Sequence, residues 1–259
     1  MESAGVNGNS RRRRVRDAHA LPRRWVAAYL MLLAVVVAGG LLFSQYMRDG
    51  VRQRAANEIA AIADLKAGQI RAWLDERLAD ARAAVESPFF SARARELLAH
   101  PEDAALREDL LAWMRSRMDN YGYRSVFLLD ADAEPALSEN PGGDPLGEYA
   151  QGVARGALES GDVVLSDLHR GEGDGCIHMD LVAPIPSPQG GRPAGALLLR
   201  ADPYHLFYPL IQSWPTPSET AETLLVRREG KEVLFLNQLR HRAGTALELR
   251  FPLGEGGAR

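Results

Sequence analysis

The residues that decide the fold run from 176 to 200 and read CIHMDLVAPIPSPQGGRPAGALLLR. Apolar residues dominate both ends of this stretch. The segment Ser187-Pro-Gln-Gly-Gly-Arg-Pro193 between them supplies residues that favour turns. We therefore predict an antiparallel hairpin of two buried strands, 176–185 and 194–200.

The segments before this hairpin predict both helices and strands. A helix is expected from Pro101 to about residue 120, followed by an apolar strand at 124–130. A short helix at 146–158, closed by glycine, and a strand at 162–166 come next. Helices and antiparallel strands in this order predict an α+β module, a sheet with helices on its flanks.

A long amphipathic helix is predicted from about residue 49 to residue 87. Ser87-Pro88 ends it, because the residue before a proline disfavours the α region. Only Lys66 interrupts the apolar stripe. Such a helix could be an exposed stalk, a coiled-coil dimer seam or both. The apolar positions are Val51, Ala55, Ile59, Ile62, Ile70, Leu74, Leu78, Ala81 and Val85.

Residues 25–47 form an uncharged, mostly apolar run between Arg24 and Arg48. As a helix it would be roughly 34 Å long, enough to cross a bilayer core. A secretory signal peptide is the alternative, but its apolar part is usually shorter and its cleavage site is missing here. Seven arginines within residues 1–24 predict a cytoplasmic N-terminus and an inner-membrane protein with everything after about residue 48 outside. The arginines are not interleaved with aromatic residues, which argues against nucleic-acid binding.

A second folded unit is expected to begin at residue 214, where the sequence reads WPTPSETAETLLVRREGKEVLFLN. Residues 222–237 of this segment predict a hairpin. The family resemblance given below implies that 202–212 form a connecting helix. Trp214 and its neighbouring prolines could form either a rigid connector or part of a ligand site. An isolated hairpin is marginally stable, so we expect residues 222–253 to be held only by packing on the long helix.

Composition excludes several classes of protein. The chain has 259 residues, of which 46% are hydrophobic and 25% charged, as in globular proteins. Its one cysteine, Cys176, rules out an internal disulfide framework and is expected to be a small buried or half-buried residue. No nucleotide-binding or hydrolase motif occurs, so we expect neither catalysis nor a cofactor. His169 and His178 lie too far apart in sequence to predict a tight metal site.

Taken together, these segments resemble the double Cache sensor modules of bacterial membrane transducers, which are related to PAS domains. The segments that carry the resemblance are LKAGQIRAWLDERLADAR, YGYRSVFLLDADAEP, the 176–200 hairpin with ADPY after it, and the segment that opens at Trp214. The resemblance covers nearly everything after residue 25.

The resemblance implies a particular domain order. A cytoplasmic tail (1–24), a membrane span (25–47) and a stalk helix (48–87) precede a membrane-distal PAS-like module (88–213) and an incomplete proximal one (214–259). In this family a second span follows, with a cytoplasmic output such as a histidine kinase, a diguanylate cyclase or a chemotaxis domain. Because neither follows here, we expect a fragment of a longer product or a truncated reading frame.

Five residues are predicted to contact a ligand in the distal module: Tyr121, Tyr123, Arg124, His178 and Asp180. Arg124 could pair with a ligand carboxylate and Asp180 with an amine. Alternatively, His178 and Asp180 face solvent and Arg124 only bridges the helix end. The Arg-x-Trp-Tyr pattern of amino-acid-binding Cache domains is not recognisable, which argues against an amino-acid ligand.

The function predicted from the sequence is extracytoplasmic sensing of an unidentified small molecule, relayed by the long helix, with a homodimer formed along that helix. A membrane-anchored structural or interaction module without a small-molecule ligand is the alternative. An anchored hydrolase would need an activated nucleophile, and the sequence offers no candidate.

Overall fold

The computed structural model describes residues 23–173, 175–205, 207–215 and 219–254. Most of the predicted cytoplasmic tail and the last five residues lie outside these ranges. The chain divides into two compact units, one ending at Ala60 and the other spanning Ala61–Arg259. Helix α1 (Arg23–Glu86) contributes residues to both units.

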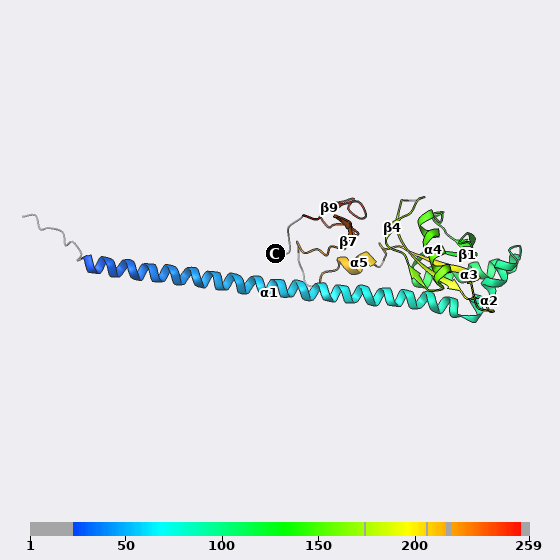
Figure 1. Ribbon diagram of the computed structural model, residues 1–259, viewed down its shortest axis with the longest axis horizontal. Coiled ribbons are helices and arrows are strands. Elements are labelled where there is room, and N and C mark those ends of the chain that lie inside the picture. Colours follow the sequence, from blue (N-terminus) through cyan, green and yellow to red (C-terminus); the bar gives the residue numbers. More distant parts are fainter. Residues whose placement is uncertain (1–22, 174, 206, 216–218, 255–259) are drawn as a thin grey trace, which may run out of the picture. The chain divides into compact units, whose positions relative to one another are not determined.

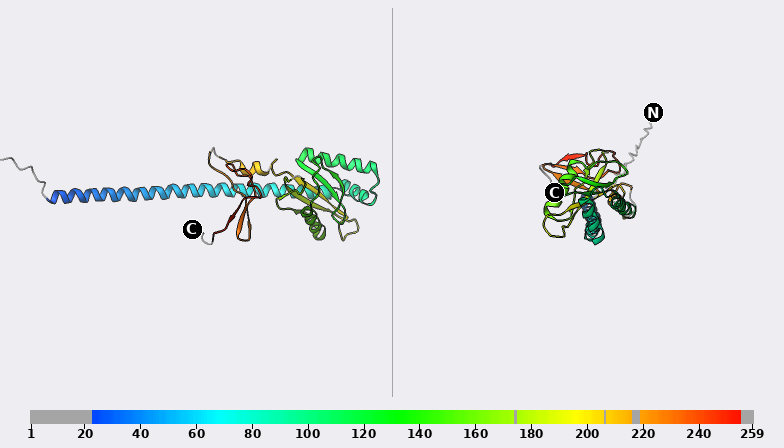
Figure 2. Two further views of the ribbon diagram at one scale, coloured as in Figure 1. Left: turned by 90° about the horizontal axis from the view of Figure 1, so that it is seen from above. Right: turned by 90° about the vertical axis from the view of Figure 1, so that its right-hand side faces the viewer.

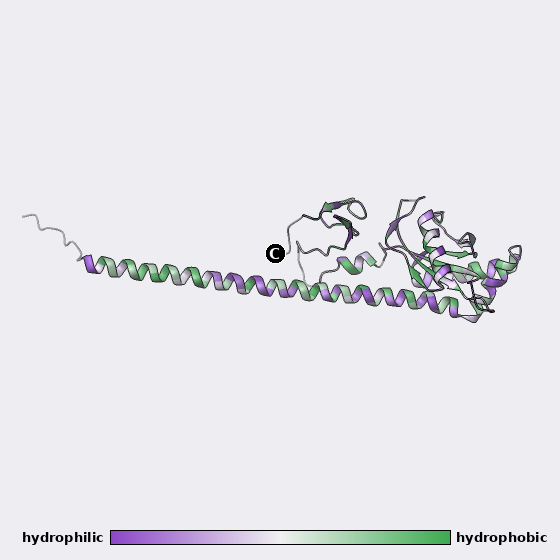
Figure 3. Cartoon of the chain, in the orientation of Figure 1, coloured by the Kyte–Doolittle hydropathy of each residue, from purple (hydrophilic) through white to green (hydrophobic). Residues whose placement is uncertain are grey.

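The first unit consists, in its described part, of the N-terminal portion of α1. Large apolar side chains such as Leu32, Val36 and Leu42 are exposed here. Figure 3 shows a mostly hydrophobic stretch near the N-terminal end of α1, followed by a part in which hydrophilic and hydrophobic residues alternate. Within the described residues, α1 is the one helix long and apolar enough to cross a membrane.

The second unit begins with the remainder of α1, followed by α2 (Pro88–Ala99) and α3 (Ala104–Tyr121). Helix α2 was not predicted: Pro88 ends α1 but occupies the first turn of a new helix, where a missing N–H costs nothing. The predicted start of α3 at Pro101 is wrong, because Asp103 caps the helix by accepting a hydrogen bond from the backbone N–H of Leu106 (3.0 Å).

One antiparallel sheet, to which the strands labelled β1 and β4 in Figure 1 belong, forms the centre of this unit. Its strand order is β2-β1-β6-β5-β3, with β4 also paired to β5. The predicted 176–200 hairpin is confirmed as β5 and β6, which pair from Met179↔Ala201 to Ile185↔Gly195. Strands β2 and β4 were not predicted. The elements are β1 (Tyr123–Leu129), β2 (Pro135–Glu139), α4 (Glu148–Ser160), β3 (Val164–Leu165), β4 (His169–Arg170), β5 (Ile177–Ile185) and β6 (Gly195–Ala201).

Helices cover both faces of the sheet (Figure 2). One face packs on α1, α2 and α3 through residues such as Leu181 and Leu199. The other packs on α4 through Val182 and Leu198. These are called the α3 face and the α4 face below. The predicted α+β class, with a long apolar N-terminal helix and an antiparallel sheet module, is therefore correct.

A third apolar cluster joins α1 to the C-terminal strands. Trp73 of α1 packs there with Tyr208 of α5 (Phe207–Gln212) and Leu234 of β8. A three-stranded sheet includes the predicted hairpin, with a third strand that was not predicted. Its strands are β7 (Val226–Glu229), β8 (Glu232–Phe235) and β9 (Arg250–Pro252).

The expectation that residues 222–253 are held only by the long helix is wrong. Arg227 of β7 forms an ion pair with Asp167 (2.6 Å), just before β4. The Tyr208 hydroxyl of α5 donates to the carbonyl of Leu236 (2.6 Å). The C-terminal strands are therefore anchored to the central sheet and α5 as well.

Buried polar residues modify the predicted stripe of α1. Lys66 is buried, and its ammonium group donates to the Leu210 carbonyl (2.7 Å) and the Ser213 hydroxyl (2.8 Å). Burial lowers the pKa of Lys66. Trp73 and Arg77 are also buried, whereas Trp214, the predicted connector, is half-buried.

Candidate ligand-binding site

A buried ionic cluster lies at one end of the α4 face. Side chains alternate between the faces of a strand, so Asp180 shares the face of Val182 on β5, and Arg200 shares that of Leu198 on β6. Asp180 and Arg200 pair directly in register. They are 0% and 1% exposed, respectively. Two opposite charges therefore replace the apolar pair that the strand pattern would otherwise place there.

Arg200 binds two carboxylates at once. Its Nε donates to Asp180 Oδ1 (2.9 Å) and its Nη2 to Asp180 Oδ2 (3.1 Å), a bidentate pair. Its Nη1 donates to Asp144 Oδ2 (2.6 Å), which lies in the loop before α4. The guanidinium carbon lies 5.5 Å from the centre of the Phe127 ring. Arg200 thus joins β5, β6 and the Asp144 loop.

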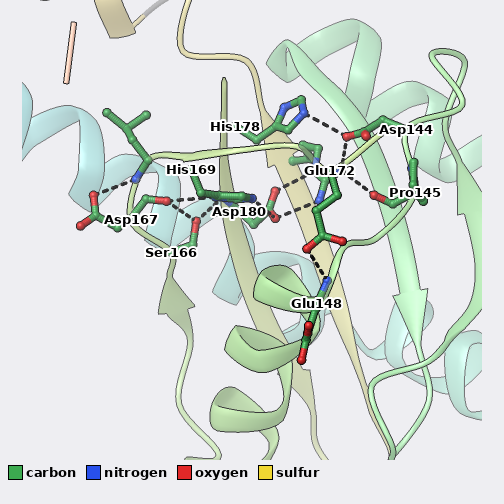
Figure 4. Close-up of polar contacts among 11 residues, drawn as sticks. Asp144, Pro145, Glu148, Ser166, Asp167, His169, Glu172, His178 and Asp180 are labelled. Atoms are coloured by element: carbon green, nitrogen blue, oxygen red, sulfur yellow. Dashed lines mark hydrogen bonds and ion pairs between the residues drawn. The ribbon is translucent and has the colours of Figure 1, made fainter. Parts of the chain in front are cut away.

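Two histidines extend the cluster (Figure 4). His178 Nε2 lies 2.9 Å from Asp144 Oδ2, and His169 Nε2 lies 3.4 Å from Asp180 Oδ2. The Ser166 hydroxyl accepts a hydrogen bond from the Asp180 backbone N–H (2.8 Å). Strands β4 and β5 and the segment between β3 and β4 therefore all contribute side chains to one buried polar site.

The cluster is organised around charged groups. Burial would raise the pKa of Asp180, but hydrogen bonds from His169 and Arg200 outweigh burial and hold this pKa below its usual value. Burial would lower the pKa of Arg200, but Asp180 and Asp144 raise it. The Asp180–Arg200 pair therefore remains ionised inside the protein.

Two loops close over this end of the α4 face. In the first loop, Asn140 Nδ2 donates to the Asp144 carbonyl (2.5 Å). In the second, Glu172 accepts a hydrogen bond from the backbone N–H of Glu148 (2.9 Å), which ties it to the start of α4. The loops approach so closely that a Cβ atom on Gly173 would lie 2.5 Å from Pro145 Cδ. This contact explains the glycine at position 173.

The two carboxylate oxygens of Asp144 differ in their contacts. Asp144 Oδ2 contacts Arg200 and His178, whereas Asp144 Oδ1 is buried and has no hydrogen-bond partner among the residues that the structure describes. A buried carboxylate oxygen without a partner is costly, and in proteins such atoms usually meet a water molecule or a ligand.

The structure places the five predicted ligand residues in three separate locations. His178 and Asp180 lie together in the cluster, and the alternative that they face solvent is wrong, because both are 0% exposed. Arg124 lies near both loops, with Nη2 3.9 Å from Cys176 Sγ and Nη1 3.9 Å from Asp202. Cys176 is half-buried, as the sequence allowed.

Tyr121 and Tyr123 lie elsewhere. Tyr123 belongs to the apolar cluster of the α3 face, and Tyr121 is exposed at the end of α3. A register shift between Tyr123 and Ser125 explains the separation, because it places Tyr123 on the same face as Val126.

Sequence reasoning missed Arg200, Asp144, His169 and Ser166 as members of the cluster. Arg200 had a usable signal, a charge at the end of the apolar run 194–200. Asp144 had none, since aspartate is common in a proline- and glycine-rich loop. In the described ranges, no group of three or more His, Cys, Asp or Glu residues could hold a metal ion.

Neither a protein-family model nor a curated protein matches the sequence. Solved structures do match. The sensor domain of the V. cholerae histidine kinase DctB has a TM-score of 0.52 at 14% identity, covering 64% of this chain and 61% of that domain. The ligand-binding domain of the Pseudomonas fluorescens chemoreceptor CtaA, in complex with L-leucine, has a TM-score of 0.50 at 14% identity, covering 77% of this chain and 76% of that domain.

These likenesses establish the fold. The chain has the fold of the Cache-type sensor domains of bacterial histidine kinases and chemoreceptors. It spans 61% of the DctB sensor domain, somewhat less than two thirds.

Proposed function

We propose that this chain is the extracytoplasmic sensing region of a membrane-bound signal-transduction protein. A small molecule binds in the distal module, 88–213, and α1 relays binding to a cytoplasmic output domain that these 259 residues do not include. The Cache-type fold and the apolar N-terminal portion of α1 support this proposal. The arginines of residues 1–24 support a cytoplasmic N-terminus.

The observation that carries the proposal is the unpartnered Oδ1 of Asp144. It belongs to a buried ionic cluster that two loops cover. A ligand with a hydrogen-bond donor would satisfy this oxygen, and opening of the loops would admit it. Binding sites with a few converging polar groups in an otherwise apolar module have this composition.

Ligand identity is best approached by a screen. A donor group, such as an ammonium or hydroxyl, is the requirement that Asp144 Oδ1 sets. The CtaA domain was solved with L-leucine, so amino acids belong in the screen even though the Arg-x-Trp-Tyr pattern is missing from this sequence.

A homodimer along α1 is part of the proposal, because a single span transmits a displacement only by moving against a partner. Exposed apolar residues of α1 such as Val51 and Ile59 support it. Mass photometry of the full chain in nanodiscs tests this part by itself.

The main experiment follows thermal unfolding of the full chain in nanodiscs against a panel of amino acids, organic acids and amines. We expect at least one compound to raise the Tm, and Asp144→Asn to abolish that rise while circular dichroism shows a folded protein. Asp132→Asn is the matched control, because Asp132 is 84% exposed at its side chain and lies outside the cluster. A ligand-induced rise in Tm that persists in Asp144→Asn would show that the ligand does not bind at this site.

A second candidate function is an anchored interaction module with no small-molecule ligand. The mutual pairing of Asp144, Asp180 and Arg200 favours it, because such a cluster can serve to fix the fold alone. The same screen decides between the two candidates, since a panel that leaves the Tm unchanged supports the interaction module.

A further inference from the structure

A pocket lies on the α3 side of the central sheet, away from the ionic cluster, where α1, the end of α3 and the segment after β6 meet. Its volume is about 470 Å³. Trp73 and Arg77 of α1 line it, together with Tyr121, Tyr123 and Asp202. It therefore contains two of the three predicted ligand residues that lie outside the ionic cluster, Tyr121 and Tyr123.

The walls of this pocket are acidic and aromatic. Glu76, Asp119 and Asp202 supply three carboxylates, and the rings belong to Trp73, Tyr121 and Tyr123. Arg77 is the one Lys or Arg among the residues lining the pocket.

Existing contacts already balance the charge of Arg77. Its Nη2 lies 3.1 Å from Asp80 Oδ2 and 3.3 Å from Glu76 Oε1, and its Nη1 donates to the Tyr121 carbonyl (3.4 Å). Asp119 has no such cation beside it among the lining residues, and Asp202 has only Arg124, at 3.9 Å. Arg117, which does not line the pocket, lies 4.9 Å from the centre of the Tyr121 ring. The lining itself holds three carboxylates and one arginine, and this excess of negative charge favours cations over anions.

Buried polar atoms without partners accompany these charges. Trp73 Nε1 and Tyr123 Oη have no hydrogen-bond partner among the described residues, and both residues are at least nine-tenths buried. Burying such groups without partners is costly. The Tyr123 hydroxyl can accept from an ammonium group, and the Trp73 N–H can donate to a hydroxyl.

We propose that this pocket is a second binding site, independent of the ionic cluster, for a small organic cation with an ammonium group. Carboxylates attract the charge, and aromatic rings contact it and any attached methyl groups by cation–π interaction. An anion would meet Glu76, Asp119 and Asp202 with only an already paired arginine to bind it. Because Trp73, Glu76 and Arg77 belong to α1, an occupant of the pocket contacts this helix directly.

Isothermal titration calorimetry of the full chain in a maltoside detergent tests the proposal. The probes are ethanolamine, which has a hydrogen-bonding ammonium and a hydroxyl, and choline, whose ammonium cannot donate. The neutral choline isostere 3,3-dimethyl-1-butanol and acetate are the controls. We expect at least one ammonium probe to bind and neither control to bind. Binding of ethanolamine alone would indicate that the ammonium group is recognised through hydrogen bonds. Binding of choline, with or without binding of ethanolamine, would indicate recognition by cation–π interaction.

Substitutions locate the binding. The double variant Glu76→Gln, Asp119→Asn should bind the ammonium probe with an affinity lower by about tenfold or more, because two nearby negative charges are lost from accessible positions. Glu108→Gln is the matched control, since it removes an exposed acid from the same helix as Asp119 and should change affinity less than about twofold. Asp202 is kept, because its Oδ1 accepts from the Tyr204 backbone N–H (2.8 Å).

Three results would overturn the proposal: no binding of either ammonium probe, equal binding of choline and its neutral isostere, or unchanged affinity in the double variant. None of these depends on Asp144. Failure here and failure of the ionic cluster as a sensor site are therefore separate outcomes.

Discussion

The two faces of the central sheet use the same pair of strands for opposite purposes. On the α3 face, Leu181 of β5 pairs with Leu199 of β6. One residue along, on the α4 face, Asp180 pairs with Arg200. Both pairs are fully buried. At neighbouring positions of the same two strands, one face therefore buries an apolar pair and the other a charged pair.

The two pairs differ in what they contribute to folding. Burying a leucine side chain stabilises a protein by about 1.5–3 kcal/mol. A buried ion pair gains little net stability, because desolvation offsets the attraction, yet breaking it is strongly destabilising. The α3 face thus stabilises the module, whereas the α4 face holds a charged arrangement whose retention needs another reason. The ligand binding that we propose at Asp144 would supply one.

Arg200→Met is the variant with the largest expected effect. It leaves Asp180 and Asp144 buried without their shared cation, so we expect the free energy of unfolding to fall by about 3–5 kcal/mol at pH 7. Urea unfolding of the full chain in detergent, followed by circular dichroism, measures it. Arg192→Met is the control, because the Arg192 side chain is 64% exposed.

A second substitution keeps this test informative if Arg200→Met does not fold. Arg200→Lys retains the charge but loses the bidentate geometry, and we expect it to fold with an intermediate loss. A loss below about 1 kcal/mol in Arg200→Met would contradict the contrast between the faces, because an uncompensated buried charge cannot be that inexpensive.

The sequence predicted the parts of this fold that depend on local pattern. The β5–β6 hairpin was readable because two apolar runs flank a turn rich in glycine and proline, and Gly161 marked the end of α4. Helix α2 was missed because Pro88 both ends one helix and starts the next. Strand β4 was missed because two residues, His169 and Arg170, have no periodicity to detect.

The site could be predicted only in part, for the same reason. His178 and Asp180 stood out as polar residues alternating within an apolar strand. Their partners Asp144 and Arg200 lie 36 and 20 positions from Asp180 in the chain. That is too far for any local sequence rule, so only the folded structure brings them together. Tyr123 lies away from the ionic cluster, on the α3 face, because an irregularity in pairing reverses its face. Long-range register, not residue type, was the missing information.

On the α3 face, the Tyr123 hydroxyl titrates at high pH, and this titration should have the next largest effect on the free energy of unfolding. Burial, opposed by the nearby Arg77, raises the pKa of Tyr123 to about 12. An unfolded tyrosine ionises near pH 10, so between about pH 10 and 12 the unfolded chain loses a proton that the folded chain keeps. Stability is therefore complete below about pH 10 and falls as the pH rises through this window, by up to about 1.4 kcal/mol per pH unit.

Tyr123→Phe removes the group responsible, so its free energy of unfolding should fall less steeply across this window than that of the unsubstituted chain. Urea unfolding at several pH values measures both slopes. Tyr149→Phe is the control, because Tyr149 is 45% exposed and should leave the slope unchanged. Burial also raises the pKa of Tyr208, so part of the slope remains in Tyr123→Phe. Identical slopes for Tyr123→Phe and the unsubstituted chain would show that the α3 face does not shield this hydroxyl.

Ser166→Ala should have the smallest effect and acts on the ionic cluster without changing its charge. The Ser166 hydroxyl accepts from the backbone N–H of Asp180, and its removal leaves a buried donor without this partner. We expect a loss of about 1 kcal/mol in the free energy of unfolding. Ser138→Ala, at an exposed position on β2, should lose less. Ser166→Ala can also be tested in the ligand screen. If it reduces the ligand-induced rise in Tm that Asp144→Asn is expected to abolish, then the backbone of β5 helps to position the charged end of the α4 face. Equal stability of the two serine variants would mean that the cluster is held by its charges alone.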